Sequence, residues 1–466
     1  MMLPDTFCKR TRALLGDERW SVMENALNEE PTVSVRCNPW KSAGWQSERW
    51  QTDGAVPWCA EGFYLKTRPS FTFDPFLHAG VYYVQEASSM FVSHAVRELV
   101  KMWDEERGML VLDMCAAPGG KSTAMLGALP KNSMLFSNEP LRLRANILAE
   151  NLSKYGHPNV VVTNNYPNDY ERSGLLFDLI LCDVPCSGEG MFRKDAGAIE
   201  EWSEEHVRQC SQLQREIVNC AWKVLRPGGF LIYSTCTFNR EENEDNVRWM
   251  VDELEATPWL IDYDRNWGIQ GSMTEEYAGP CYRFLPGFTR GEGLFMSVVR
   301  KLPLENTERG QKKNIPLPPS KRKGSNLQKG KKAIEWIEGN EGYEVLNKGD
   351  MVYGVSRRWL SEVERGMMHL RVLQAGVTLG AQKGKDLLPD VRLALSTVLC
   401  HDAFPQVALD YEQAMAYLHR EALVLHDTPR CVVLVSYQGF PLGFVKNVGN
   451  RANNLYPAEW RVRKRE

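Results

Sequence analysis

The stretch "VLDMCAAPGGKSTAML", residues 111–126, decides the fold. An apolar run typical of a buried strand leads into a Pro-Gly-Gly turn, and a helix-like segment follows at once. The same order of strand, turn and helix repeats as far as residue 236. Strands that alternate with helices predict a doubly wound, mostly parallel α/β sheet. In such sheets, ligands bind beyond the carboxyl ends of the strands.

The elements expected in this region follow from apolar runs and helix boundary signals. One helix ends at Gly156, and the long helix that begins at Ser203 is expected to end at the Pro-Gly-Gly of residues 227–229. The expected strands are residues 109–115, 133–140, 160–163, 176–184 and 230–236, and the expected helices are residues 122–129, 141–156 and 203–229.

The length of 466 residues is too great for one hydrophobic core, so several domains are expected. Pattern changes predict a small α/β domain over residues 1–95 and the strand–helix repeat over residues 96–302. A basic linker over residues 303–332 precedes a compact mixed domain over residues 333–466. Between residues 309 and 332 there are nine Lys or Arg and no acid, which fits either a solvated linker or a flexible tether that binds phosphates.

Composition excludes several classes of protein. The net charge of −3 gives no overall attraction to nucleic acid, and an apolar run long enough for a membrane span is lacking. The charged N-terminus does not look like a signal peptide, so we expect a cytoplasmic protein. The twelve cysteines are scattered without a CxxC pair, which indicates reduced thiols and no structural metal site.

The turn "CAAPGGKST", residues 115–123, allows two interpretations. A P-loop would need glycine where Cys115 stands, which disfavours an NTPase. The alternative is a nucleoside or amino-acid cofactor over the strand end, approached closely by the backbone at Gly119 and Gly120. Glu139 ends the next strand, where an acid typically binds a ribose diol.

Two cysteines follow strands at the same predicted edge. Asp183 and Cys186 lie in "CDVPCSGEG", and Cys236 ends "YSTC". Buried cysteines are usually small hydrophobic residues, and this is the interpretation for the cysteines within a strand or along a helix, Cys182, Cys210 and Cys220. Cys186 and Cys236 instead fall in Gly/Ser/Thr-rich turns, where a thiolate beside an acid suits covalent catalysis.

With these residues, the chain resembles the RNA 5-methylcytosine methyltransferases, which include the NSUN proteins and the bacterial RsmB and RsmF enzymes. The resemblance covers roughly residues 30–300 and favours the RsmF (YebU-type) branch, because residues 1–95 leave no room for the large N-terminal domain of RsmB. It rests on "VLDMCAAPGGKSTAML", "NEPLRLRANILAENLSKYG", "LCDVPCSGEGMFRKD", "LRPGGFLIYSTCTFNREENEDNVRWM" and "RFLPGFTRGEGLFMSVVRK".

The resemblance implies a Rossmann-like class I methyltransferase domain and a role for each matched residue. Cys236 would attack C6 of a cytosine, Cys186 would assist product release, and Asp183 would contact both cofactor and base. S-adenosyl-L-methionine would lie over Cys115, Ala116, Ala117, Pro118, Gly119, Gly120 and Lys121, with Glu139 on its ribose. Asn165, or its neighbour Asn164, would lie near the adenine.

The same resemblance implies the partners. Small-subunit (16S) ribosomal RNA is the expected substrate, with a PUA-like RNA-binding domain at residues 333–466. Separately, we expect a monomer that needs no metal and no membrane. Transfer RNA, a catalytically idle assembly factor on the same fold, and a purely stabilising C-terminal domain remain as alternatives. One departure is Gly287, because many relatives carry histidine after the proline.

Overall fold

The computed structural model describes residues 3–42, 47–104, 106–303, 333–384 and 386–465. The basic segment 309–332 therefore lies outside the described residues, and both interpretations of it stay predictions. Over the described ranges, no helix combines the length and the apolar character needed to cross a membrane.

The N-terminal part consists of two helices followed by an antiparallel sheet in the order β2-β3-β1-β4. The helices pack their apolar faces against residues of the segment after Cys186, including Phe192 and Trp202. The elements are α1 (Asp5–Leu15), α2 (Asp17–Leu27), β1 (Val33–Cys37), β2 (Thr52–Val56), β3 (Cys59–Leu65), α3 (Pro75–His78), β4 (Tyr82–Val84) and α4 (Phe91–Val100).

The central sheet has parallel strands in the order β9-β8-β5-β6-β7. Antiparallel β12 and β10 extend it beyond β9, and β11 pairs with β12. The doubly wound sheet predicted from the sequence is confirmed. Its strands are β5 (Leu110–Asp113), β6 (Met134–Asn138), β7 (Val160–Thr163), β8 (Phe177–Asp183), β9 (Leu225–Thr235), β10 (Thr257–Pro258), β11 (Tyr282–Phe284) and β12 (Leu294–Arg300).

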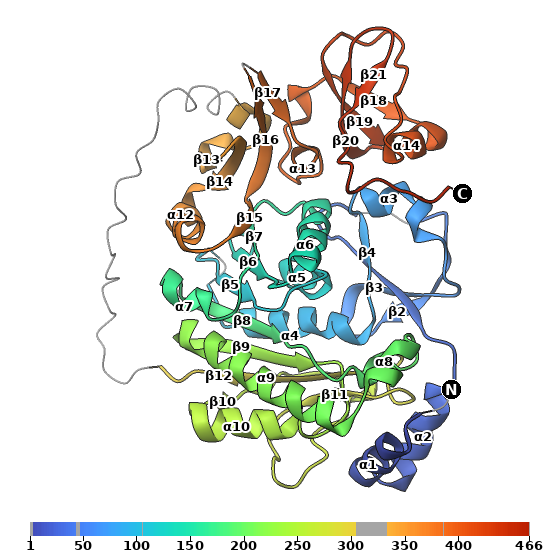
Figure 1. The fold of residues 1–466 in the computed structure, drawn as a ribbon, viewed down its shortest axis with the longest axis vertical. Helices are drawn as coiled ribbons and strands as arrows, with labels where there is room; N and C mark the ends of the chain where they lie inside the picture. Colours follow the sequence, from blue (N-terminus) through green and yellow to red (C-terminus); the bar gives the residue numbers. More distant parts are fainter. Residues whose placement is uncertain (1–2, 43–46, 105, 304–332, 385, 466) are drawn as a thin grey trace.

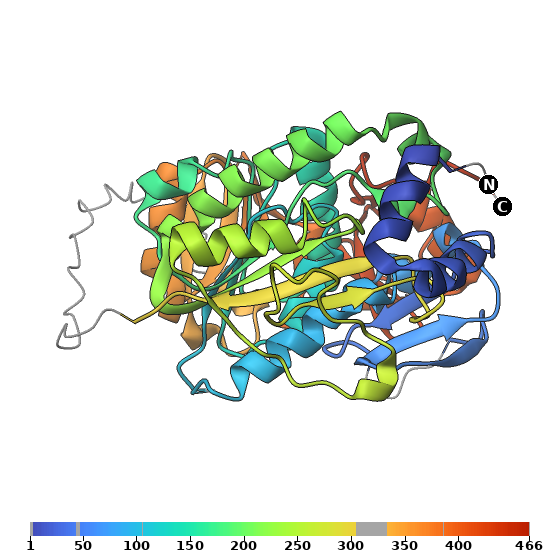
Figure 2. The ribbon, with the colours of Figure 1, turned by 90° about the horizontal axis from the view of Figure 1, so that it is seen from below.

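Helices cover both faces of this sheet, as Figures 1 and 2 show. Side chains alternate along each strand: Val111 belongs to the core under α4, α5 and α6, whereas Leu110 and Leu112 belong to the core under α9 and α10. The helices are α5 (Gly120–Leu126), α6 (Arg142–Tyr155), α7 (Asp169–Ser173), α8 (Ala196–Glu201), α9 (Glu204–Val224) and α10 (Glu244–Leu254).

The boundary between α9 and β9 differs from the sequence prediction. Ser203 caps α9 as expected, since its Oγ accepts from the backbone N–H of His206. The helix ends at Val224, however, and residues 227–229 belong to β9. They form an irregular start to that strand, at which the pairing register with β8 shifts.

The C-terminal part forms two further sheets and one strand of the central sheet. Sheet β13-β14-β16-β17 comes first, and sheet β18-β19-β20-β21 ends the chain. In the chain β15 lies between β14 and β16, but it pairs antiparallel with β7 and so extends the central sheet (Figure 1). The elements are β13 (Tyr343–Lys348), β14 (Met351–Ser356), α12 (Leu360–His369), β15 (Val372–Ala375), β16 (Val377–Lys383), β17 (Asp386–Pro389), α13 (Val391–Ala394), β18 (Gln406–Leu409), α14 (Tyr411–Leu418), β19 (Val432–Tyr437), β20 (Phe440–Asn447) and β21 (Ala452–Asn454).

Candidate active site

The predicted site residues meet at the carboxyl ends of adjacent parallel strands. Asp113 ends β5, Asp183 ends β8, and Cys236 follows β9. The register pairs Asp183 with Ser234, so the loops that carry Cys186 and Cys236 leave the sheet side by side. This is the edge at which the topology of a doubly wound sheet places its ligands.

The two thiols lie against each other. Cys186 Sγ and Cys236 Sγ are 3.0 Å apart, and the backbone N–H of Cys236 donates to Cys186 Sγ at 3.4 Å. The hydrogen bond with Cys236, together with burial, raises the pKa of the Cys186 thiol well above its usual value. Cys186 therefore keeps its proton near neutral pH and can donate it in a hydrogen bond to Cys236.

Asp183 is held from two sides beside this pair. Its Oδ1 accepts from Ser234 Oγ at 2.7 Å, and its Oδ2 lies 2.7 Å from Lys121 Nζ. Burial lowers the pKa of Lys121, but the attraction of Asp183 outweighs it and the net shift is upward. Lys121 is thus a cation that connects the turn after β5 with the acid after β8.

The turn that contains residues 115–121 is fixed by neighbours on α6 and β6. Arg144 donates to the carbonyl of Ala117 at 3.0 Å, and Asn151 donates to that of Pro118 at 2.8 Å. The N–H of Ala116 donates to the carbonyl of Asn138 at 2.8 Å. The backbone of this turn is therefore preorganised by hydrogen bonds before any ligand arrives.

Asp113 is a buried acid beneath this turn. Its Oδ2 accepts from Ser122 Oγ at 2.6 Å, whereas its Oδ1 has no hydrogen-bond partner in the part of the chain that the structure describes. Burial raises the pKa of Asp113 to about 7. An acceptor that is buried and unpaired at the end of β5 is unusual, because buried polar atoms are normally satisfied.

Comparisons with known proteins give the family. A model of the 16S rRNA methyltransferase RsmB/F matches residues 99–300, one of the N-terminal domain of 16S rRNA methyltransferase RsmF matches residues 3–87, and one of the methyltransferase RsmF PUA domain matches residues 404–462. The ribosomal RNA small subunit methyltransferase F of Escherichia coli O81 (strain ED1a) is 31% identical over 421 residues, which cover 87% of this chain and 84% of that protein. The chain belongs to the RsmF family.

Other relatives agree with this assignment. The ribosomal RNA small subunit methyltransferase F of Shewanella loihica is 29% identical over 428 residues, covering 89% of this chain and 84% of its own length. Among solved structures, a methyltransferase homolog protein from Pyrococcus horikoshii is 28% identical with a TM-score of 0.54, covering 64% of this chain and 95% of that one. NSun6 from Pyrococcus horikoshii, at 20% identity and a TM-score of 0.53, shares the fold.

Membership of the RsmF family makes the chain an S-adenosyl-L-methionine-dependent methyltransferase, which confirms the resemblance and the cofactor inferred from the sequence. The residues present fit this cofactor. Asp113 leaves an acceptor unpaired, Gly119 and Gly120 leave the turn without large side chains, and Glu139 follows β6 next to it. The cofactor, once bound, supplies an electrophilic methyl group.

Glu139 and the asparagines after β7 show contacts that the sequence did not reveal. Glu139 Oε1 accepts from the N–H of Leu141 at 2.9 Å, and the side chain is 2% exposed. Asn164 donates to the carbonyls of Glu139 and Pro140. The roles of Glu139 on the ribose and Asn165 near the adenine stay predictions.

Asn165 also connects the site to the C-terminal part. Its Oδ1 accepts from the N–H of Arg371 at 3.1 Å, and its N–H donates to Asn138 Oδ1 at 3.1 Å. Arg371 directly precedes β15, so the contact joins the end of β7 to the strand that extends the central sheet. The order of residues along the chain gave no signal of this pairing.

Gly287, the departure from many relatives, has a steric reason. Its φ is +87°, and a Cβ at this position would lie 2.8 Å from Val22 Cγ1 and 2.9 Å from the Val22 carbonyl oxygen in α2. Helix α2 packs directly on this turn, and a histidine side chain would displace it.

Proposed function

We propose that the chain transfers a methyl group to C5 of a cytosine in small-subunit ribosomal RNA, with Cys236 as the nucleophile. The observation that carries the proposal is the pair of sulfurs 3.0 Å apart, at the sheet edge that also bears Asp183 and Lys121. The names of the relatives, which act on small-subunit ribosomal RNA, support the substrate class.

The chemistry needs a covalent catalyst because C5 of cytosine is too weakly nucleophilic to take a methyl group directly. Addition of the Cys236 thiolate to C6, with a proton placed on N3, makes C5 enamine-like. Asp183, held by Ser234 and Lys121, is the group we assign to N3. After methyl transfer, removal of the C5 proton re-forms the double bond between C5 and C6. The C6–S bond breaks, and its electron pair returns to Cys236.

The contact between the two sulfurs supports this assignment of roles. The raised pKa of Cys186 keeps that thiol protonated, so its S–H can stabilise a thiolate on Cys236 by a charge-assisted hydrogen bond. The same proton donor lies beside the sulfur that must leave C6. Cys186 is therefore suited to assist release, as proposed for it from the sequence.

The test uses the full chain with methyl-labelled cofactor and either small-subunit ribosomal RNA or transfer RNA, followed by digestion to nucleosides. We expect label in 5-methylcytosine from ribosomal RNA, and label on any other atom or base overturns the proposal. Label in transfer RNA alone would replace the substrate class.

Variants of the two thiols test their roles separately. Cys236→Ala should abolish both turnover and the covalent complex. Cys186→Ala should accumulate a complex with RNA that survives denaturant. Cys220→Ala on α9, a half-buried thiol away from the sheet edge, is the matched control and should behave like the unchanged chain. Free turnover by Cys186→Ala with trapping by Cys236→Ala would reverse the roles.

A further inference from the structure

Two buried carboxylates hold the thiol-bearing loops together. Glu189 follows Cys186 by three positions and is 1% exposed, and Glu242 follows Cys236 by six positions and is 0% exposed. Neither forms an ion pair with a basic side chain among the described residues. Burying a carboxylate without a cation is costly, so the hydrogen bonds that the two carboxylates accept must offset that cost.

Glu189 holds the backbone that follows Cys236. Its Oε2 accepts from Thr237 Oγ1 at 2.5 Å, and from the backbone N–H groups of Phe238 at 2.6 Å and Asn239 at 2.9 Å. The carbonyl of Cys236 in turn accepts from the N–H of Gly190 at 2.8 Å. The loop after β8 therefore determines the course of the loop after β9.

Glu242 makes the reverse connection. Its Oε2 accepts from the backbone N–H of Ser187 at 3.0 Å and from Gln214 Nε2 at 2.7 Å, and its Oε1 accepts from Ser187 Oγ. Ser187 directly follows Cys186. Each loop thus carries a carboxylate that binds the residue next to the cysteine of the other loop.

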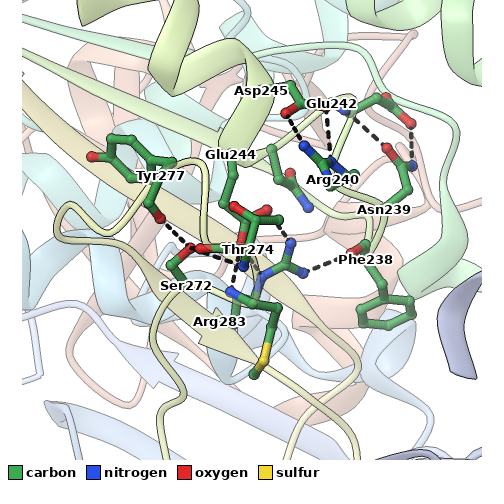
Figure 3. Close-up of polar contacts among 12 residues, drawn as sticks. Phe238, Asn239, Arg240, Glu242, Glu244, Asp245, Ser272, Thr274, Tyr277 and Arg283 are labelled. Atoms are coloured by element: carbon green, nitrogen blue, oxygen red, sulfur yellow. Dashed lines mark hydrogen bonds and ion pairs between the residues drawn. The ribbon is translucent and has the colours of Figure 1, made fainter. Parts of the chain in front are cut away.

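Asn239 joins the two carboxylates. Its Nδ2 lies 3.1 Å from Glu189 Oε1 and 2.7 Å from Glu242 Oε1. Figure 3 shows this amide against Glu242, in the segment that follows Phe238. The orientation of the Asn239 amide is fixed, because its Oδ1 accepts from the N–H of Glu242 at 2.9 Å. Exchanging its oxygen and nitrogen would break this hydrogen bond.

We propose that Glu189 and Glu242 act as a reciprocal clamp that fixes the distance between the Cys186 and Cys236 sulfurs. Both are positioning residues, since they act through the loops and touch no reacting atom. Their catalytic meaning rests on the proposed function. A loosened clamp leaves Cys236 able to attack but moves Cys186 away from the sulfur that must leave, so release slows more than attack.

Glutamine substitutions test the clamp. Each oxygen of Glu242 accepts from at least two donors, so in either orientation the amide NH2 of Glu242→Gln faces donors. The same holds for Glu189→Gln, because Glu189 Oε1 accepts from both Asn239 Nδ2 and Trp202 Nε1. Asn239→Ala is a milder variant that keeps both carboxylates and removes the amide between them.

Asp178→Asn is the matched control. Asp178 is 3% exposed and lies at the opposite end of β8, where it accepts from the N–H of Leu110 at 2.9 Å and from Arg226 at 2.5 Å. Its loss removes a buried carboxylate from the strand that leads to Cys186 and leaves the thiol loops unchanged. Melting temperatures of all variants show how much each substitution destabilises the fold.

The first measurement reports the sulfur distance without any RNA. A diazene oxidant takes two electrons and two protons from the thiols, giving a hydrazine and a disulfide, and mass spectrometry quantifies the peptide linked through Cys186 and Cys236. We expect the three clamp variants to form this disulfide about tenfold more slowly or worse, because small displacements strongly reduce the rate of a proximity-dependent reaction. Asp178→Asn should retain the rate of the unchanged chain at a comparable loss of melting temperature.

The second measurement is the covalent RNA complex. The clamp variants should accumulate it during turnover, with kcat and KM for RNA reduced together because release is slowed more than attack, whereas the control should not. Disulfide formation at an unchanged rate in the clamp variants overturns the clamp. If the clamp variants form the disulfide slowly but the unchanged chain methylates no RNA, the clamp stands and the proposed function is wrong.

Discussion

Arg36 of the N-terminal sheet reaches into the methyltransferase fold and donates from Nη2 to Thr123 Oγ1 in α5 at 2.6 Å. The guanidinium is buried, with the residue 2% exposed, and its Nε donates to Gln85 Oε1 at 2.7 Å. A further bond goes to the carbonyl of Gly120. The N-terminal part is therefore a structural neighbour of the turn at residues 115–121.

Replacing Arg36 by alanine should weaken both stability and cofactor binding. The change leaves Gln85 Oε1 without its buried donor and removes one of the donors to the carbonyl of Gly120, which we expect to cost about 2–4 kcal/mol of unfolding free energy. Denaturant unfolding and calorimetric titration with S-adenosylhomocysteine measure the two effects. Arg97→Ala removes a partly exposed pair with Glu61 and should cost about 1 kcal/mol or less. Equal losses of stability and of S-adenosylhomocysteine binding in the two variants would show that Arg36 has no special link to the turn at residues 115–121.

The stability of the fold should fall as pH rises through the range in which Asp113 ionises. Its pKa is raised by burial from 3.8 to about 7, so the folded state holds a proton that the unfolded state has lost. This contribution is fully present below pH 4 and is lost as pH rises to about 7, by an amount on the order of 4 kcal/mol. Asp113→Asn should flatten this part of the curve, measured by denaturant unfolding from pH 4 to 8. Parallel curves for the two proteins would exclude Asp113 as the source.

The sequence predicted the central sheet and the meeting of its site residues well. Apolar runs followed by turns fix the order of strands, and the parallel topology then brings Asp183, Cys186 and Cys236 to one edge without further information. That step needs only local patterns and one general rule of α/β sheets.

Long-range pairing could not be predicted in the same way. The pairing of β15 with β7 joins residues about two hundred positions apart and has no local signature. Glu189 and Glu242 look like ordinary surface acids in "SGEGMF" and "NREENED", and only the packed loops show that both are buried. Asn165 was singled out as a cofactor residue, yet its contact with Arg371 depends on that same unpredictable pairing.

The joint between β15 and β16 should be sensitive to a single methyl group. Gly376 has a φ of +58°, and a Cβ there would lie 2.4 Å from the carbonyl oxygen of Gly354. Gly376→Ala should therefore cost about 2–4 kcal/mol, because backbone strain and a clash add together. Gly349→Ala is a close control, since its φ is also +58° but nothing lies within 4 Å. It should cost about 1 kcal/mol by thermal or denaturant unfolding. Similar losses of unfolding free energy in Gly376→Ala and Gly349→Ala would show that the backbone near Gly354 moves to relieve the clash.

The ion pair of Arg283 with Glu244 should stabilise the segment that follows Cys236. The side chains are 1% and 0% exposed, and Arg283 Nη1 also donates to the carbonyl of Phe238 at 2.6 Å (Figure 3). Glu244→Gln keeps the shape but leaves a buried guanidinium without its counter-charge, so we expect a loss of about 3–5 kcal/mol in unfolding free energy. The double variant Arg283→Met with Glu244→Gln removes both charges and should recover part of that loss. The contrary outcome is a double variant that is clearly less stable than Glu244→Gln, with the two losses adding as for independent sites. That result would show that the hydrogen bond from Arg283 to Phe238, and not the ion pair, holds the segment.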